Sequence, residues 1–152
     1  MQLRPLLAKL DTVANFLQSP LLLAIRLYWG WAFVQTGWGK LNNLERTTGF
    51  FESLHIPLPK VNAIMAGSTE CLGGALLALG LFARPASVPL IFTMIVAYAT
   101  ADREALQAII SDPDKFVSAA PFLFMLASLI VLVFGPGKLA LDALLGGTKK
   151  SA

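Results

Sequence analysis

The feature that most constrains this chain is a series of four apolar segments, each close to the length that crosses a lipid bilayer. They run from about residue 20 to 39, 61 to 82, 85 to 101 and 115 to 134. A transmembrane helix needs about 20 apolar residues, because the hydrocarbon core is about 30 Å thick. Hydrophobic residues make up 56% of the chain and charged residues 14%, against roughly 25% charged in soluble domains. The sequence therefore predicts an all-α integral membrane protein, a four-helix bundle.

An amphipathic segment precedes the first apolar run. Apolar residues recur at helical spacing from Leu3 to Leu17, which predicts a helix lying in the membrane interface. Ser19 and Pro20 are typical of the start of a separate, second helix. No small-residue cleavage site follows, so we expect a retained anchor and not a signal peptide. The predicted parts are an interfacial lead over residues 1–19, a membrane domain over 20–145 and a flexible polar tail over 146–152.

The connecting segments differ in length and character. Residues 41–60 are polar, with one amphipathic turn expected around Phe50, and residues 102–114 suggest a short interfacial helix. Ala83 and Arg84 allow only a tight turn, so the helices on either side should be antiparallel neighbours. Asp112 is expected to cap the last membrane helix, and Pro121 to kink it.

Charge and cysteine content limit the partners of the chain. The net charge is +3, but the basic residues are scattered and form no stripe, which argues against nucleic acid. Six Lys and Arg residues on the side of the termini against five on the other favour termini in the cytoplasm, in a multi-pass protein of a bacterial inner membrane. The lone Cys71 offers no disulfide or dithiol, and the lone His55 no metal site.

Two charged residues fall inside predicted spans, Arg26 and Glu70. Each such charge costs roughly 2.5 to 3.5 kcal/mol to insert, so each needs a partner or a function. Aligning Lys40 with Lys60 places Glu70 level with Gly30, which predicts an Arg26–Glu70 ion pair with Lys40 about 15 Å away. The pair is either a structural bridge that sets helix register or the polar centre of a pocket for a small head group or a proton.

Weaker candidates share these spans. Gln35, Thr93, Tyr98 and Ser128 could line the same pocket or satisfy local hydrogen bonds. The segment 61–82 is rich in glycine and alanine, which predicts close contact with another helix.

An ordered series of short motifs resembles the DoxX family of small bacterial and archaeal membrane proteins. The motifs are Arg26 to Gly30 with Phe33 and Gly37 to Leu41, then Phe51 with Ile56-Pro57, then Glu70 to Gly74 with Leu79 to Leu81 and Arg84, and finally Gly135 to Leu139 with Leu141-Asp142. The resemblance implies a four-helix membrane bundle and an oxidoreductase subunit linked to quinones or sulfur compounds. It marks Arg26, Lys40, Glu70, Arg84 and Asp142 as the polar positions in family-like motifs.

Three functions follow as hypotheses. The first is a membrane subunit of a redox system, not catalytically complete on its own, that binds a quinone or similar molecule between the helices predicted at 20–39 and 61–82. The second is a membrane anchor that docks a soluble redox enzyme through residues 41–60 and 102–114. The third is a small transporter, in which a homo-oligomer formed through the glycine-rich segment supplies further spans.

Overall fold

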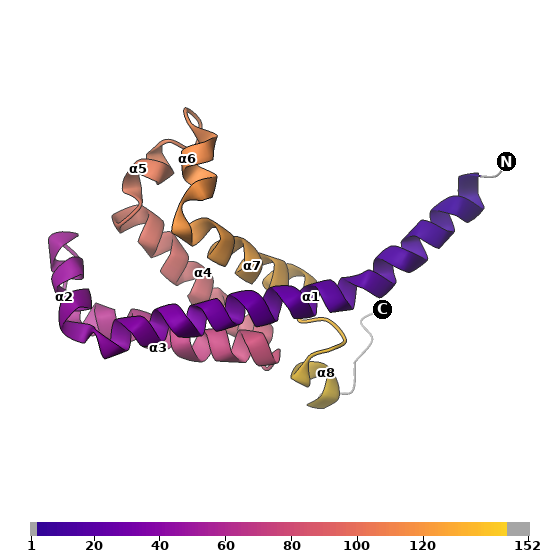
Figure 1. The fold of residues 1–152 in the computed structure, drawn as a ribbon, viewed down its shortest axis with the longest axis horizontal. Coiled ribbons are helices and arrows are strands. Elements are labelled where there is room, and N and C mark those ends of the chain that lie inside the picture. Colours follow the sequence, from indigo (N-terminus) through magenta and orange to yellow (C-terminus); the bar gives the residue numbers. More distant parts are fainter. Residues whose placement is uncertain (1–2, 146–152) are drawn as a thin grey trace.

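The computed structural model describes residues 3–145, and side chains from residue 7 onward; it is all-helical, with no strand among these residues (Figure 1). The tail predicted over 146–152 lies outside the described residues. The helices are α1 (Leu3–Asn42), α2 (Leu44–Ser53), α3 (Pro59–Leu79), α4 (Ala83–Thr100), α5 (Arg103–Gln107), α6 (Pro113–Ser118), α7 (Ala120–Phe134) and α8 (Leu141–Leu145).

The predicted lead and the first predicted span form one helix, α1, so the expected break at Ser19 is wrong. Pro20 lies inside this 40-residue helix. A proline inside a helix removes one backbone hydrogen bond and commonly kinks the axis without ending it. Figure 1 shows the N-terminal part of α1 bent away from the rest of the molecule.

The other helix ends follow local sequence signals closely. α3 is followed by Gly80, which adopts the left-handed conformation, and α7 is followed by Gly135 with φ of 79°. Asp112 caps α6 as expected, because its side chain accepts a hydrogen bond from the Lys115 amide. The last predicted span is divided at Ala119, whose backbone is extended, into α6 and α7. Pro121 lacks the N–H that would continue the helix, so a break replaces the expected kink.

The long helices form two pairs, α1 with α3 and α4 with α7. The pairs meet at a core of six buried apolar side chains: Phe33, Leu77, Ala83, Leu90, Met94 and Val131. From the α3–α4 turn the pairs diverge, so that α2 lies at the tip of one and α5 and α6 at the tip of the other (Figure 1). The molecule therefore has a closed end at the turn and an open end between these tips.

Two helices, α3 and α4, are long and apolar enough to cross a membrane by length and composition. α7 is apolar but shorter, at 15 residues. α1 is far longer than a bilayer is thick, but its composition is more polar than that of α3 and α4. The all-α prediction is confirmed, and the structure identifies two of the four predicted segments as candidate spans.

Candidate functional site

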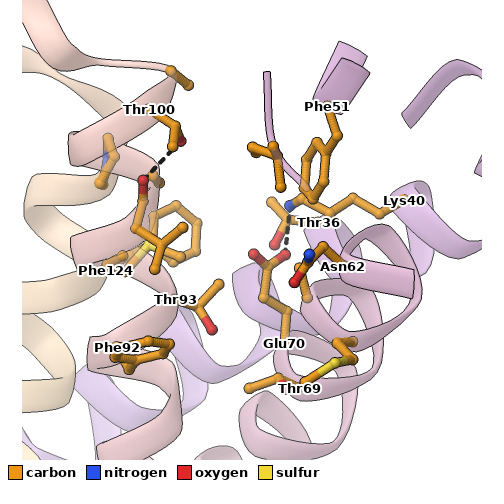
Figure 2. Close-up of a pocket in the computed structure, with 18 of the residues that line it drawn as sticks. Thr36, Lys40, Phe51, Asn62, Thr69, Glu70, Phe92, Thr93, Thr100 and Phe124 are labelled. Atoms are coloured by element: carbon orange, nitrogen blue, oxygen red, sulfur yellow. Dashed lines mark hydrogen bonds and ion pairs between the residues drawn. The ribbon is translucent and has the colours of Figure 1, made fainter. Parts of the chain in front are cut away.

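A cavity of about 550 Å³ lies between the two helix pairs, on the side of the open end. Its walls come from α2, α3, α4 and α7, with Thr36 and Lys40 contributed by α1. The lining is mainly apolar and aromatic, and the aromatic residues are Phe50, Phe51, Phe92 and Phe124. Figure 2 shows Glu70 on one wall and Thr93 and Phe124 on the opposite wall. The cavity is therefore an apolar space with a small number of polar groups inside it.

The charged centre of this cavity is an ion pair between Lys40 and Glu70. Lys40 Nζ donates to Glu70 Oε2 at 2.6 Å, and the Glu70 side chain is only 3% exposed (Figure 2). The predicted Arg26–Glu70 pair is therefore wrong, and so is the estimate that Lys40 lies too far away. Glu70 is nevertheless one of the residues that line the cavity.

The register of α1 against α3 explains this difference. A Cβ added to Gly37 would lie 2.9 Å from the Glu70 Cβ and 2.6 Å from the Gly67 carbonyl oxygen. Glu70 is therefore level with Gly37, two helical turns from Gly30, and Lys40 is one turn beyond it. The alignment of Lys40 with Lys60 failed because it placed Glu70 level with Gly30, about two helical turns from its true neighbour Gly37.

Close glycine contacts leave no space for a ligand between α1 and α3. A Cβ at Gly30 would lie 2.7 Å from the Gly74 carbonyl oxygen, and one at Gly74 would lie 2.6 Å from the Phe33 Cβ. The backbones of the two helices are thus in direct contact, as the small residues of segment 61–82 predicted. The cavity lies on another face of α3, toward α4 and α7.

Arg26 belongs to a second polar cluster, at the closed end of the molecule. Its side chain is fully buried; Nη2 donates to the Leu139 carbonyl at 2.8 Å, and Nη1 to the Ala78 carbonyl at 3.4 Å. Asp142 is close enough to interact with the guanidinium through its charge. The burial of Arg26 is therefore offset by main-chain carbonyls and a carboxylate and not by Glu70.

Asp142 connects the C-terminal segment to the α3–α4 turn. Its carboxylate accepts hydrogen bonds from the Phe82 amide at 2.8 Å and the Ala83 amide at 3.2 Å, and its own amide donates to the Gly80 carbonyl. These are the unpaired amides at the start of α4, where a carboxylate is also favoured by the helix dipole. Asp142 thus caps α4 from 59 or 60 residues away in sequence.

Arg84 and Tyr98 have structural contacts outside the cavity. Arg84 donates to the Val133 carbonyl at 3.4 Å, near the closed end. The buried Tyr98 donates to the Phe116 carbonyl at 2.7 Å, and its ring stacks on Phe116 at 4.8 Å between centroids. Of the six predicted site residues, Lys40 and Glu70 pair at the cavity. Arg26 and Asp142 both lie at the closed end with main-chain partners, and Arg84 and Tyr98 tie helices together.

The weaker candidates divide in the same way. Thr93 lines the cavity, whereas the buried Ser128 donates to the Phe124 carbonyl within α7. Cys71 contacts the Val34 carbonyl at 3.5 Å through Sγ. Among residues 3–145 no group of three or more His, Cys, Asp or Glu side chains is placed to hold a metal ion.

Several cavity residues were missed from the sequence. The aromatic residues Phe92 and Phe124 and the polar residues Thr36, Asn62 and Thr69 all line it. Only the amphipathic turn expected around Phe50 gave a signal for this part of the wall. The other lining residues show no pattern in the sequence, because the helices that carry them are far apart along the chain and meet only in the folded structure.

Outside the long helices, one exposed ion pair connects α5 to α6. Lys115 Nζ lies 3.0 Å from Glu104 Oε2. The hydrogen bond that Lys115 donates to Glu104 lowers the pKa of Glu104, and the positive charge of Lys115 lowers it further.

Comparisons with known proteins give one family match and one similar membrane protein. The DoxX family model matches residues 21–103, a range that includes Arg26, Lys40 and Glu70 but not Asp142. An uncharacterized membrane protein of Mycobacterium tuberculosis is 33% identical over 135 residues, which cover 81% of this chain and 80% of that protein. No solved structure gives a significant match.

Proposed function

This chain belongs to the DoxX family of membrane proteins, and from that membership we propose that it is a membrane subunit of a redox system that holds a quinone-type ring beside Lys40 and Glu70. The observation that carries the proposal is the ion pair itself, because it stands on the wall of a mainly apolar cavity. A buried charged pair in an open cavity is typical of a binding site, whereas a purely structural bridge is usually enclosed by packed side chains.

The cavity suits such a ring in size and in chemistry. Its volume of about 550 Å³ is within the range of roughly 300 to 1,000 Å³ that is usual for small-molecule pockets. Phe51, Phe92 and Phe124 offer aromatic faces, and the Lys40 ammonium has further N–H groups for an oxygen of the ring. A bound quinone supplies electron and proton transfer, and the part of the protein is to bind and orient it.

The proposal includes a four-span arrangement in the cell membrane. The spans are α1 from Pro20 onward, α3, α4 and α7, with the residues before Pro20 lying in the interface and both termini in the cytoplasm. Large apolar side chains support it because they point outward from these helices: Trp31 is 60% exposed, Leu72 68% and Val133 64%. In a soluble protein such surface would be costly, whereas lipid covers it without penalty.

The anchor hypothesis has less support from the same geometry. Half of the segment 41–60 is occupied by α2, which packs on α3 and lines the cavity through Phe50 and Phe51. It therefore has a role within this chain, which leaves residues 102–114 as the main docking surface for a soluble enzyme. A stoichiometric partner that is recovered in mild detergent and lost when residues 102–114 are altered would favour the anchor over the quinone site.

The test of the quinone site uses two alanines of the same helix. Ala97 lines the cavity, whereas Ala99 is exposed on another face of α4. Ala97→Leu should fill part of the cavity, and Ala99→Leu should not. We expect short-chain quinones to raise the melting temperature of the parent and of Ala99→Leu in detergent, but not of Ala97→Leu. Equal stabilisation of both variants would refute binding in this cavity.

A further inference from the structure

The polar groups of the cavity differ in whether they can still donate a hydrogen bond to a ligand or can only accept one. The Thr36 hydroxyl donates to the Phe33 carbonyl at 3.0 Å, the Thr93 hydroxyl to Pro89 at 2.9 Å and the Thr100 hydroxyl to Val96 at 2.7 Å. Each of these hydroxyls already donates its one hydrogen to a carbonyl of its own helix, and its lone pairs can accept a hydrogen bond from another partner. The threonines of α1 and α4 thus face the cavity as acceptors.

Glu70 adds the strongest acceptor. Its Oε2 is bound to Lys40, which leaves the lone pairs of Oε1. In Figure 2 the Glu70 carboxylate and Thr93 face each other across the cavity, from α3 and α4. Within the described residues, the donors left uncommitted are the remaining N–H groups of Lys40 and Asn62 and the hydroxyl of Thr69. Lone pairs therefore outnumber free donors around the space that a ring would occupy.

We infer that the cavity selects the hydroxylated, reduced form of an aromatic ring, a hydroquinone, over the corresponding quinone. This inference rests on the proposed function and assigns the form of the ligand within it. A hydroquinone carries two O–H donors, which suit Glu70 and Thr93, and its oxygens can also accept from Lys40. A quinone can accept from Lys40 in the same way but has no donor for the lone pairs of Glu70 and Thr93.

The size of the preference follows from a single hydrogen bond. A bond to a charged acceptor contributes enough to change affinity by at least about tenfold. We therefore expect the hydroquinone to bind about tenfold more tightly than the quinone. By linkage, this preference raises the midpoint potential of the bound couple by about 30 mV.

Three ligands with the same ring and side chain separate the contribution of the O–H donors to the affinity from that of the ring. The full-length protein in detergent is titrated anaerobically with a short-chain quinone, its hydroquinone and the hydroquinone dimethyl ether, and tryptophan fluorescence reports the dissociation constants. We expect tight binding of the hydroquinone and about tenfold weaker binding of the other two. In Thr93→Val the preference should fall severalfold, because one acceptor is lost. Thr12→Val removes the same kind of intrahelical bond on the exposed part of α1 and should leave the preference unchanged.

The outcomes separate this inference from the proposed function. Equal affinity for quinone and hydroquinone, or tighter binding of the quinone, would overturn the inference and leave the quinone site intact. Binding of none of the three ligands would overturn both. Glu70→Gln is a second variant: replacing a carboxylate oxygen by an amide donor should reduce the preference, and an unchanged ratio would contradict the role given to Glu70.

Discussion

Lys40 and Glu70 form an ion pair with 2.6 Å between Nζ and Oε2, in which the carboxylate side chain is 3% exposed and the lysine side chain 30%. Moving either charge out of water alone is costly, and only their mutual attraction offsets that cost. Each residue therefore depends on the other, and the pair joins the end of the first long helix to the middle of α3.

Removing one partner of this pair should cost more than removing both. Lys40→Met leaves a buried carboxylate without its counter-ion, and we expect a loss of about 3 kcal/mol in the free energy of unfolding. Adding Glu70→Leu should recover most of this loss, because no unpaired charge remains. Unfolding in mixed detergent micelles measures the three variants. Strict additivity of the single effects would contradict a direct coupling.

Close packing of α1 on α3 predicts a contrast between two neighbouring glycines. Gly37→Ala places a Cβ 2.6 Å from both the Cys71 amide nitrogen and the Gly67 carbonyl oxygen, and these backbone atoms can move only if the helices separate. We expect a loss of about 1 to 3 kcal/mol in the free energy of unfolding. Nothing lies within 4 Å of a Cβ at Gly39, so Gly39→Ala should be neutral or slightly stabilising. Equal effects of the two substitutions would refute this packing.

The cap that Asp142 provides for α4 predicts local loosening when it is removed. Asp142→Ala leaves the amides of Phe82 and Ala83 without their acceptor, and we expect a loss of about 1 to 3 kcal/mol. Hydrogen exchange should become faster at these two amides and in α8 before it does so elsewhere. Asp114→Ala, which removes an exposed carboxylate at the start of α6, is the matched control. Uniform acceleration across the molecule would contradict a local cap.

The two tyrosines of the chain allow a matched test of one buried hydrogen bond. Tyr98→Phe removes the bond to the Phe116 carbonyl and should cost about 1 kcal/mol, because the carbonyl loses its partner. Tyr28 is 69% exposed, so Tyr28→Phe should change the free energy of unfolding by much less. If both substitutions have the same small effect, Tyr98 does not tie α4 to α6.

The exposed pair of Glu104 and Lys115 predicts a pH dependence for the α5–α6 region. The folded-state pKa of Glu104 lies below its ordinary value of 4.5. The contribution of the pair is therefore complete above that ordinary value and is lost as the pH falls through the lower, folded-state pKa. The protection of the α5 and α6 amides against hydrogen exchange, measured relative to the intrinsic exchange rate at each pH, should fall in this acidic range. In Glu104→Gln this fall in protection should be absent, and its persistence would refute the assignment.

The sequence predicted the helices better than their contacts. Periodicity and the signals at Asp112 and Gly135 located the two ends of the last predicted span, because capping is a local property. The Lys40–Glu70 pair was missed because register depends on which glycines meet, and Gly37 fits against Gly67 only in the assembled pair. The partner of Arg26 was missed for a related reason. Every residue has a main-chain carbonyl, so the sequence does not show that the carbonyl of Leu139 is the one that accepts from Arg26. The cavity could not be foreseen, since its walls come from five separate helices.

The glycine contacts between α1 and α3 also fix where the charged pair of the cavity lies. Two backbones in direct contact cannot approach further without a clash, so the spacing of the two helices is set by Gly30, Gly37 and Gly74. Lys40 and Glu70 extend from these two helices, and their positions relative to each other therefore depend on residues that carry no side chain.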